Sequence, residues 1–430
     1  MLIEGDSLTH RFGMISNRFE ELKGQVNSDL KSMTETANSY TVAIADLNKR
    51  IAADIGRANG QQQPNDLLDE RDKLLNKLAD LVDVSVIPQA NGMVSVLMSN
   101  GLPLVMDTQS STLGIKENDF DPTRLEVTYA NANGQEQVIT DRIKGGKIAG
   151  TLRFREEILD PAQQKLGAVA AAIAIDFNAI HEVGYDLDGA LGGAFFKFTG
   201  VPEVPAIAAQ TNAGTASVTA AFGVNSADLN TSDYLLELNG GVYTLKRLSD
   251  DSSINLTNTG GVLTATGPGV LPGITLAISL GALNGDQFFI RPTYQAASQL
   301  AMNISDPRKI AAATNLHTDG VTALQGDNSN ALSLANLANS SGMFGGTASF
   351  QESYGQIVSK VGGLTHAANI SAGAQQSLLN RATETRENLA GVNLDEEAAN
   401  LIKFQQSYQA AAQAISTAST LFDTLIGAVR

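Results

Sequence analysis

Two short stretches near the middle of the chain carry residue types that bind metal ions. His181-Glu182 begins the pattern of a zinc-binding helix, in which two His residues four positions apart hold the ion and the Glu acts as a base. The position of the second His is occupied by Tyr185. Residues 186–189, Asp-Leu-Asp-Gly, begin like a calcium loop but lack its third acidic position and its closing Glu. We therefore predict no metal site, and a turn at 186–189.

The remaining sequence offers little material for catalysis. The 430 residues include no Cys, which excludes disulfides, zinc–thiolate sites and Cys nucleophiles, and the four His lie at positions 10, 181, 317 and 366. No nucleophile elbow, Walker A loop or dinucleotide-binding glycine motif occurs. The prolines around Gly267-Pro268-Gly269 favour a turn over a phosphate-binding loop. The sequence predicts a protein that is not an enzyme and that binds no cofactor and no metal.

Charge and hydrophobicity narrow the classes of partner. The net charge of −16 argues against nucleic acid and against anionic membrane surfaces, because phosphate groups are bound by basic faces. No stretch has the roughly 18 consecutive apolar residues of a membrane span, so we expect no membrane insertion. The first residues lack a basic region followed by an apolar stretch, which argues against a cleaved signal peptide.

The last forty residues contain an apolar residue at every seventh position. The two core positions of these heptads are filled by Leu394, Leu401, Tyr408, Ile415, Phe422 and Val429, and by Phe404, Ala411, Ala418 and Leu425. A seven-residue repeat on a helix of 3.6 residues per turn keeps one seam facing a partner along the whole length. We therefore predict a long helix over 393–430 that needs a partner to be stable.

Other helical patterns precede it. Residues 15–58 have a seam of apolar residues at alternating steps of four and three, formed by Val26, Leu30, Met33, Ala37, Tyr40, Ile44, Leu47 and Ile51. Further helices are predicted over 66–82, 147–183 and 348–388. Within the first of these, residues 69–72, Asp-Glu-Arg-Asp, predict a surface or interhelical face of ion pairs.

Between the helices the apolar period changes to two. Turn signals at Asn91-Gly92, Asn100-Gly101 and Asn133-Gly134 divide residues 83–146 into short strands. Residues 201–298 have a second β pattern, with a hairpin signal at residues 239–241, Asn-Gly-Gly. We expect this second segment to fold as a unit whose ends lie close together, because it interrupts a helical region.

These patterns predict an α+β multidomain fold. Its core is a long, coiled-coil-like α-helical stalk built from both ends of the chain, and two β-rich domains are inserted into it. The expected segments are the N-terminal stalk (1–82), the first β domain (83–146), the middle stalk (147–200), the insert (201–298), the C-terminal stalk (299–392) and a C-terminal assembly helix (393–430).

Four stretches, in this order along the chain, resemble bacterial flagellar axial proteins. They are residues 65–72 (Asn-Asp-Leu-Leu-Asp-Glu-Arg-Asp), 145–150 (Gly-Gly-Lys-Ile-Ala-Gly), 326–332 (Gly-Asp-Asn-Ser-Asn-Ala-Leu) and 393–401 (Asn-Leu-Asp-Glu-Glu-Ala-Ala-Asn-Leu) with the residues that follow. Within that group the chain is most similar to the hook-associated protein 1 family. Ser329 stands where the family pattern has a basic residue.

The resemblance implies a structural role in the flagellum, joining hook to filament by side-by-side packing of helical stalks. It implies self-association in a ring or tube, the hook protein and the second hook-associated protein as neighbours, and an export chaperone on the C-terminal helix. It also implies an extracellular location, reached by type III flagellar export without a cleaved signal peptide. The assembly interface is expected at Leu394, Leu401, Phe404, Tyr408, Ile415, Phe422 and Leu425.

Several alternatives stay open at the level of sequence. Another axial protein, such as the second junction protein or a hook subunit, would share the C-terminal pattern. A surface adhesin acting through residues 201–298 and a hydrolase carried on a flagellar stalk are rivals from other classes. Family members begin with an N-terminal arm that pairs with the C-terminal helix, whereas this sequence starts partway into the first stalk helices. We therefore expect either a truncated product or a misassigned start.

Overall fold

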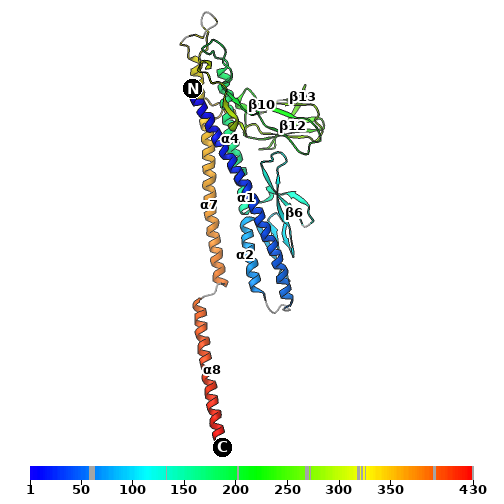
Figure 1. Ribbon diagram of the computed structural model, residues 1–430, viewed down its shortest axis with the longest axis vertical. Coiled ribbons are helices and arrows are strands. Elements are labelled where there is room, and N and C mark those ends of the chain that lie inside the picture. Colours follow the sequence, from blue (N-terminus) through cyan, green and yellow to red (C-terminus); the bar gives the residue numbers. More distant parts are fainter. Residues whose placement is uncertain are drawn as a thin grey trace. The chain divides into compact units, whose positions relative to one another are not determined.

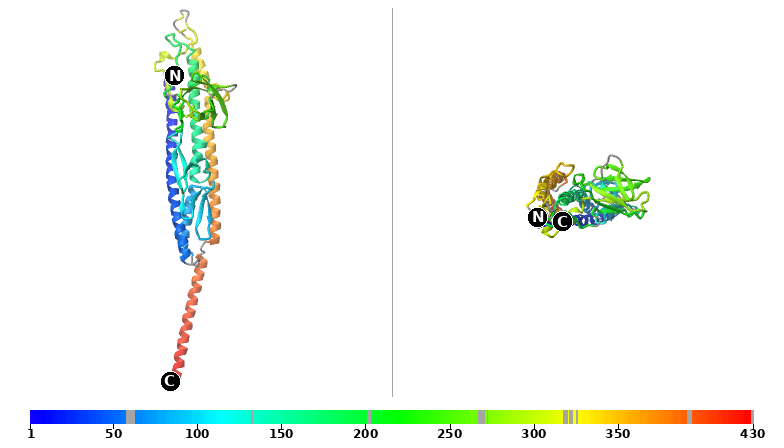
Figure 2. Two further views of the ribbon diagram at one scale, coloured as in Figure 1. Left: turned by 90° about the vertical axis from the view of Figure 1, so that its right-hand side faces the viewer. Right: turned by 90° about the horizontal axis from the view of Figure 1, so that it is seen from above.

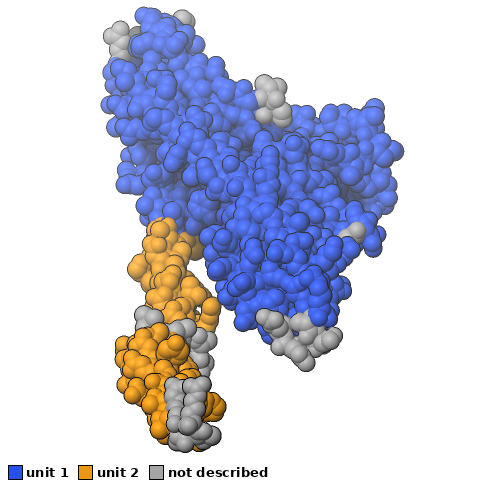
Figure 3. Space-filling view, turned by 60° about the horizontal axis from the view of Figure 1, so that its bottom comes forward, with its two compact units in different colours: residues 1–361 blue, residues 362–430 orange. Residues whose placement is uncertain are grey.

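The computed structural model describes residues 1–57, 63–131, 133–200, 203–266, 271, 273–316, 320, 323–324, 326–390 and 394–428 (Figure 1). The chain divides into two compact units, residues 1–361 and residues 362–430 (Figure 3). Among the described helices, none is both long enough and apolar enough to cross a membrane. The Gly-Pro-Gly turn predicted around 267–269 and His317 lie outside the described residues.

Helix α1, Leu2–Arg57, is the longest element of the first unit and runs beside α4, Asp160–His181, and the first β domain (Figures 1 and 2). It begins well before the predicted residue 15. The predicted seam is largely buried: Val26, Leu30, Ala37, Ile44, Leu47 and Ile51 are at most 4% exposed. Its partners are α2, Asn65–Leu81, together with α3, Gly146–Arg153, and strands of the first β domain. The seam therefore packs on a mixed surface, and coiled-coil packing of the stalk helices stays a prediction.

The first β domain contains two antiparallel sheets. The four-stranded sheet is formed by β1 (Val84–Pro88), β2 (Val94–Met98), β3 (Pro103–Met106) and β4 (Gln109–Ser110), and the three-stranded sheet by β5 (Thr112–Glu117), β6 (Leu125–Ala130) and β7 (Glu136–Val138). Amide side chains of α1 hold both sheets: Asn48 donates to the Val94 carbonyl at 2.7 Å and Asn38 donates to the Leu113 carbonyl at 2.7 Å. These bonds satisfy strand carbonyls that would otherwise be buried without partners.

Arg71 corrects the expectation of an ion-pair face at residues 69–72. Its side chain is buried, and one guanidinium nitrogen donates to the Gly92 carbonyl at 2.7 Å and to the Asn48 side chain at 3.3 Å. Burial lowers the pKa of Arg71, and the nearby Asp72 partly offsets this effect. The motif at residues 65–72 therefore ties α2 to α1 and to the turn between β1 and β2.

The helical run predicted over 147–183 is continuous but not uniform. It consists of α3 (Gly146–Arg153), a π-helical segment (Phe154–Leu159) and α4 (Asp160–His181). Pro161 gives a physical reason for the π-helical segment. Proline has no N–H for the helical ladder, and its ring crowds the carbonyl four residues earlier, so the preceding turn widens.

The insert is an eight-stranded antiparallel sheet that closes on itself. Its order is β10-β15-β14-β13-β12-β11-β16-β9, and a bridge between Val204 and Ala220 joins the two ends of that order. The strands are β9 (Ala206–Ala208), β10 (Val218–Phe222), β11 (Tyr234–Asn239), β12 (Val242–Arg247), β13 (Ser253–Thr259), β14 (Val262–Ala265), β15 (Ile274–Ile278) and β16 (Gln287–Ile290). Alternate side chains fill the interior. The hairpin predicted at residues 239–241 is confirmed, with Asn239 paired to Val242.

The two ends of the insert lie close together, as predicted. The backbone N–H of Arg291 donates to the Pro205 carbonyl at 3.0 Å. Just outside, β8 (Phe196–Phe198) pairs with β17 (Leu300–Met302), and the short α5 (Ala296–Gln299) packs on α4. This arrangement allows a separate sheet to interrupt the chain between α4 and the later helices.

The remaining elements lead to the second unit. Short helical turns occur at Thr140–Arg142, Ser226–Asp228, Pro307–Lys309 and Leu337–Asn339, and α6 spans Ser329–Asn336. Helix α7, Phe350–Ala390, starts with a capping box in which Ser349 and Glu352 exchange hydrogen bonds. Its first turns pack on the core of unit 1 through Ile357. The rest of α7 and helix α8, Leu394–Ala428, form the second unit.

Candidate assembly helix and interdomain joint

Most of the apolar side chains in the predicted seam of helix α8 are exposed. The exposed fractions are 59% for Leu401, 71% for Phe404, 78% for Tyr408, 72% for Ile415, 67% for Phe422 and 66% for Leu425. Leu394 is the first residue of α8. The side chain of Leu394 and the whole of Val429 lie outside the described residues. Their part in an interface therefore stays a prediction.

The apolar surface of α8 is wider than the heptads predicted. Ile402, Leu421 and Ile426 are 54%, 62% and 54% exposed, and each flanks the seam instead of lying on it. A seam of two positions per heptad serves one partner helix, whereas apolar flanking positions allow more than one neighbour. The signal for this breadth was in the sequence, in the doublets Leu401-Ile402 and Leu425-Ile426.

His181, the first candidate metal ligand, is a buried structural residue. Its Nε2 accepts a hydrogen bond from the Ala311 N–H at 3.0 Å, so Nδ1 carries the proton and donates to the Gly193 carbonyl at 2.7 Å. Both ring nitrogens are therefore occupied. Glu182 next to it is exposed, so the two side chains do not form a common site.

Residues 186–189 form a turn, as predicted. Asp186 Oδ1 accepts the N–H groups of Asp188 and Ala190, each at 2.9 Å, and Gly189 has a φ of 75°. Lys309 Nζ lies 3.1 Å from the Asp186 carboxylate and 3.0 Å from that of Asp188. Within the described parts of the chain, no group of three or more His, Cys, Asp or Glu side chains is arranged to hold a metal ion.

The motif at residues 326–332 ties loops to the end of α4. One Asp327 oxygen accepts the N–H groups of Thr314 and Asn315, both at 3.0 Å, and the other accepts the N–H and hydroxyl of Ser329. Asn330 donates to the Ile180 carbonyl at 3.1 Å. The Ser329 hydroxyl and amide, followed by the Thr314 and Asn315 amides, hold the pKa of Asp327 well below its usual range.

We expect Asp327→Asn to lower the thermal midpoint more at pH 7 than at pH 3. A carboxylate with a depressed folded-state pKa stabilises the fold above its unfolded pKa of about 3.9 and loses that contribution as the pH falls through the folded value. Thermal unfolding of both proteins at the two pH values measures the effect. Asp69→Asn, at an exposed carboxylate on α2, is the matched control. An equal shift at both pH values would contradict the assignment.

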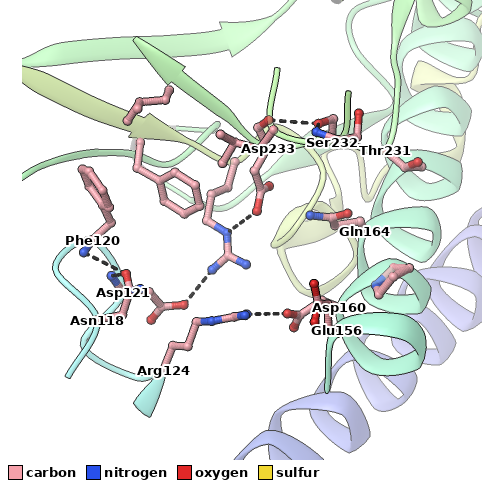
Figure 4. Close-up of a pocket in the computed structure, with 16 residues that line it drawn as sticks. Asn118, Phe120, Asp121, Arg124, Glu156, Asp160, Gln164, Thr231, Ser232 and Asp233 are labelled. Atoms are coloured by element: carbon pink, nitrogen blue, oxygen red, sulfur yellow. Dashed lines mark hydrogen bonds and ion pairs between the residues drawn. The ribbon is translucent and has the colours of Figure 1, made fainter. Parts of the chain in front are cut away.

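A second cluster, the interdomain joint, is centred on Arg291 (Figure 4). The guanidinium lies 2.7 Å from the Asp121 carboxylate, on the loop between β5 and β6, and 3.2 Å from that of Asp233, the residue before β11. All three side chains are at most 12% exposed. The guanidinium carbon also lies 3.3 Å from the ring centroid of Tyr294.

The joint continues onto the helices. Arg124 pairs with Asp160, the first residue of α4. Gln163 on α4 donates to the Tyr294 carbonyl at 3.4 Å and to Glu20 of α1 at 2.8 Å. Beside these groups is a cleft of about 670 Å³, lined among others by Glu156, Gln164 and Phe289. The spacing patterns of the sequence gave no sign of this cluster.

Two carboxylates of the joint differ in their acidity. Burial raises the pKa of Asp233, and the positive charge of Arg291 only partly opposes this. Burial also acts on Asp121, but the Thr123 hydroxyl and the charges of Arg291 and Lys23 outweigh it, so its pKa is lowered. Because its pKa is lowered and that of Asp233 is raised, Asp121 stays ionised to lower pH than Asp233 as a partner of Arg291.

Comparison with known protein families covers most of the chain. Residues 1–196 match the family described as flagellar hook-associated protein FlgK helical domain. Residues 207–292 match the D2-like domain of flagellar hook-associated protein 1, and residues 388–428 match the C-terminal region of flagellar basal body rod FlgEFG proteins. The second match corresponds to the insert and the third contains α8.

Individual relatives agree with these matches. Flagellar hook-associated protein 1 of Salmonella typhimurium is 32% identical over 98% of this chain and 75% of the relative, and that of Escherichia coli K12 is 31% identical over the same shares. The solved structure of the flagellar hook junction protein FlgK from Burkholderia pseudomallei superposes with a TM-score of 0.76 at 25% identity. That match covers 88% of this chain and 87% of the other.

Proposed function

The chain belongs to the flagellar hook-associated protein 1 family, structural proteins of the hook–filament junction, and we propose that it joins hook to filament through the exposed seam of α8. Family membership separates it from the rival readings as a second junction protein or a hook subunit. Its relatives are structural proteins of the flagellum, and no relative among them is an enzyme.

The observation that supports the role of α8 is its row of exposed apolar side chains. Phe404, Tyr408 and Phe422 are each more than two-thirds exposed. Burying one large apolar side chain contributes about 1.5–3 kcal/mol, so a whole seam can offset the loss of freedom on association. We propose that copies of the protein pack α8 and the adjoining helices side by side in a ring or tube. The flanking Ile402, Leu421 and Ile426 would contact further neighbours.

The same seam determines the partners we propose. In the junction, the hook protein and the second hook-associated protein would lie on either side of the ring. Before assembly, an unpaired apolar helix is prone to nonspecific association, and a chaperone with an apolar groove would cover it. The protein is part of the flagellum outside the cell. We propose that it arrives there by flagellar type III export without a cleaved signal peptide.

A deletion strain tests this function. We expect cells without the protein to carry hooks but no filaments and to shed flagellin into the medium, with motility lost. The full chain supplied from a plasmid should restore filaments, and a chain without residues 394–428 should not. Electron microscopy of the cells and flagellin immunoblots of the medium measure the result. Normal filaments in a clean deletion strain would rule the function out.

A further inference from the structure

We propose that the interdomain joint locks the insert and the first β domain in one orientation on the helices, so that the three parts move as a single body. The proposal concerns residues 1–361 alone and does not depend on the function of α8. It goes beyond the sequence-based expectation of two β-rich domains inserted into a helical stalk, which did not say how those domains are held.

The charged groups of the joint come from parts that are far apart in the sequence. Arg291 directly follows β16 of the insert, Asp233 directly precedes β11, and Asp121 belongs to the first β domain. The Arg291 guanidinium pairs with both carboxylates, and Figure 4 labels these two partners, Asp121 and Asp233. One buried cation therefore holds anions from both β domains. Any swing of the insert away from the first β domain would break the buried ion pair of Arg291 with Asp121, and such a pair contributes more than one at the surface.

The segment that follows Arg291 packs closely against helices α4 and α1. A Cβ atom on Gly167 of α4 would lie 1.6 Å from the Thr293 carbonyl oxygen, so the chain after Arg291 runs directly against the helix backbone. Two cations lie over the Tyr294 ring, Arg291 and Lys23 of α1, with Lys23 Nζ 4.5 Å from its centroid. Backbone contact of this closeness leaves no room for a rolling or sliding motion.

A second ion pair fixes the first β domain independently of Arg291. Arg124, the residue immediately before β6, pairs with Asp160 and lies 3.2 Å from Glu126. Arg155 of the π-helical segment donates to the Leu125 carbonyl at 2.6 Å. The widened turn thus supplies both Arg155 and the following Asp160 to the first β domain. The insert has its own attachment through Arg291, so loss of Arg291 should free the insert selectively.

Distance measurements between spin labels test the proposal on the full chain. Because the sequence contains no Cys, introduced cysteines are the only labelling sites. One pair joins the insert to the first β domain, Thr259→Cys with Asn133→Cys, and the other joins α1 to the first β domain, Glu35→Cys with Asn133→Cys; all three positions are exposed. We expect one narrow distance distribution for each pair in the otherwise unchanged protein.

Substitution of Arg291 should then affect the distance distributions of the two label pairs differently. Arg291→Met is expected to broaden the insert distribution at least twofold and to leave the α1 distribution unchanged. Lys246→Met, which removes a cation from a half-exposed pair with Asp251 within the insert, should change neither. If Arg291→Met does not fold, Asp121→Asn decides: a broadened insert distribution supports the joint. A broad distribution in the unchanged protein, or an unchanged width in the substituted one, overturns it.

Discussion

Leu401→Asp is expected to abolish incorporation of the protein into the hook–filament junction while leaving the unfolding of residues 1–361 unchanged. Leu401 is 59% exposed on α8, so a carboxylate there is tolerated before assembly. In a packed seam the same carboxylate would be buried without a partner, at a cost of several kcal/mol per copy. Filament counts in complemented deletion cells and thermal unfolding of the purified protein measure the two halves of this prediction.

A matched substitution separates the position of the charge from its presence. Gln406 is exposed and lies five residues after Leu401, on the opposite side of α8. Gln406→Asp adds the same charge outside the seam, and we expect it to leave filaments normal. If Leu401→Asp cells formed normal filaments, α8 would not be the interface. If both substitutions blocked assembly, charge and not the seam would be responsible.

Gly167→Ala should destabilise the first unit by at least about 3 kcal/mol, the upper part of the range for overpacking in a close-packed interior. The added methyl carbon would lie 1.6 Å from the Thr293 carbonyl oxygen, and a backbone atom cannot turn aside as a side-chain tip can. Either α4 or the segment from Arg291 to Tyr294 must therefore move. Chemical denaturation followed by circular dichroism measures the change in unfolding free energy.

Gly24→Ala is the control for this effect. Gly24 lies within α1, is exposed, and has no atom within 4 Å of an added Cβ. Alanine at such a helical position should stabilise the fold by about 0.5–1 kcal/mol, because it reduces the freedom of the unfolded chain. Opposite signs for the two Gly-to-Ala changes are the expected result. A loss below 1 kcal/mol for Gly167→Ala would mean that the approach of Thr293 to α4 is not tight.

Local periodicity predicted the elements but not always their partners. The seam of α1 was identified from Val26 to Ile51 because strongly apolar residues mark each turn. The beginning of α1 was missed because, of its three buried positions before residue 15, Gly5 and Thr9 are small or polar and only Phe12 is strongly apolar. Small or polar residues fit close to neighbouring chains but carry no hydrophobic signal. The sequence likewise could not show that sheets, and not only helices, cover the seam.

The joint was beyond prediction for a different reason. Arg291, Asp121 and Asp233 lie far apart along the chain, and in an acidic protein single charged residues are expected at the surface. Only the folded chain brings them together. The π-helical segment did leave a trace: Pro161 stands inside the predicted helix 147–183, and an internal proline indicates a break or distortion near that point. The six predicted segments and the seven seam residues remain predictions for the assembled protein.

The closed sheet of the insert also has a consequence for the order of folding. Strands β11 to β14 are neighbours in sequence and are joined by short connections, so their pairing needs little loop closure. The pairs of β10 with β15 and of β9 with β16 join the two ends of the insert, and such distant pairings form slowly. Until β16 arrives, β11 has an unpaired edge. Because Arg291 directly follows β16, pairing of β16 with β11 also brings the cation of the joint to its partners, so we expect the pairing of this strand and the docking of the insert to be coupled.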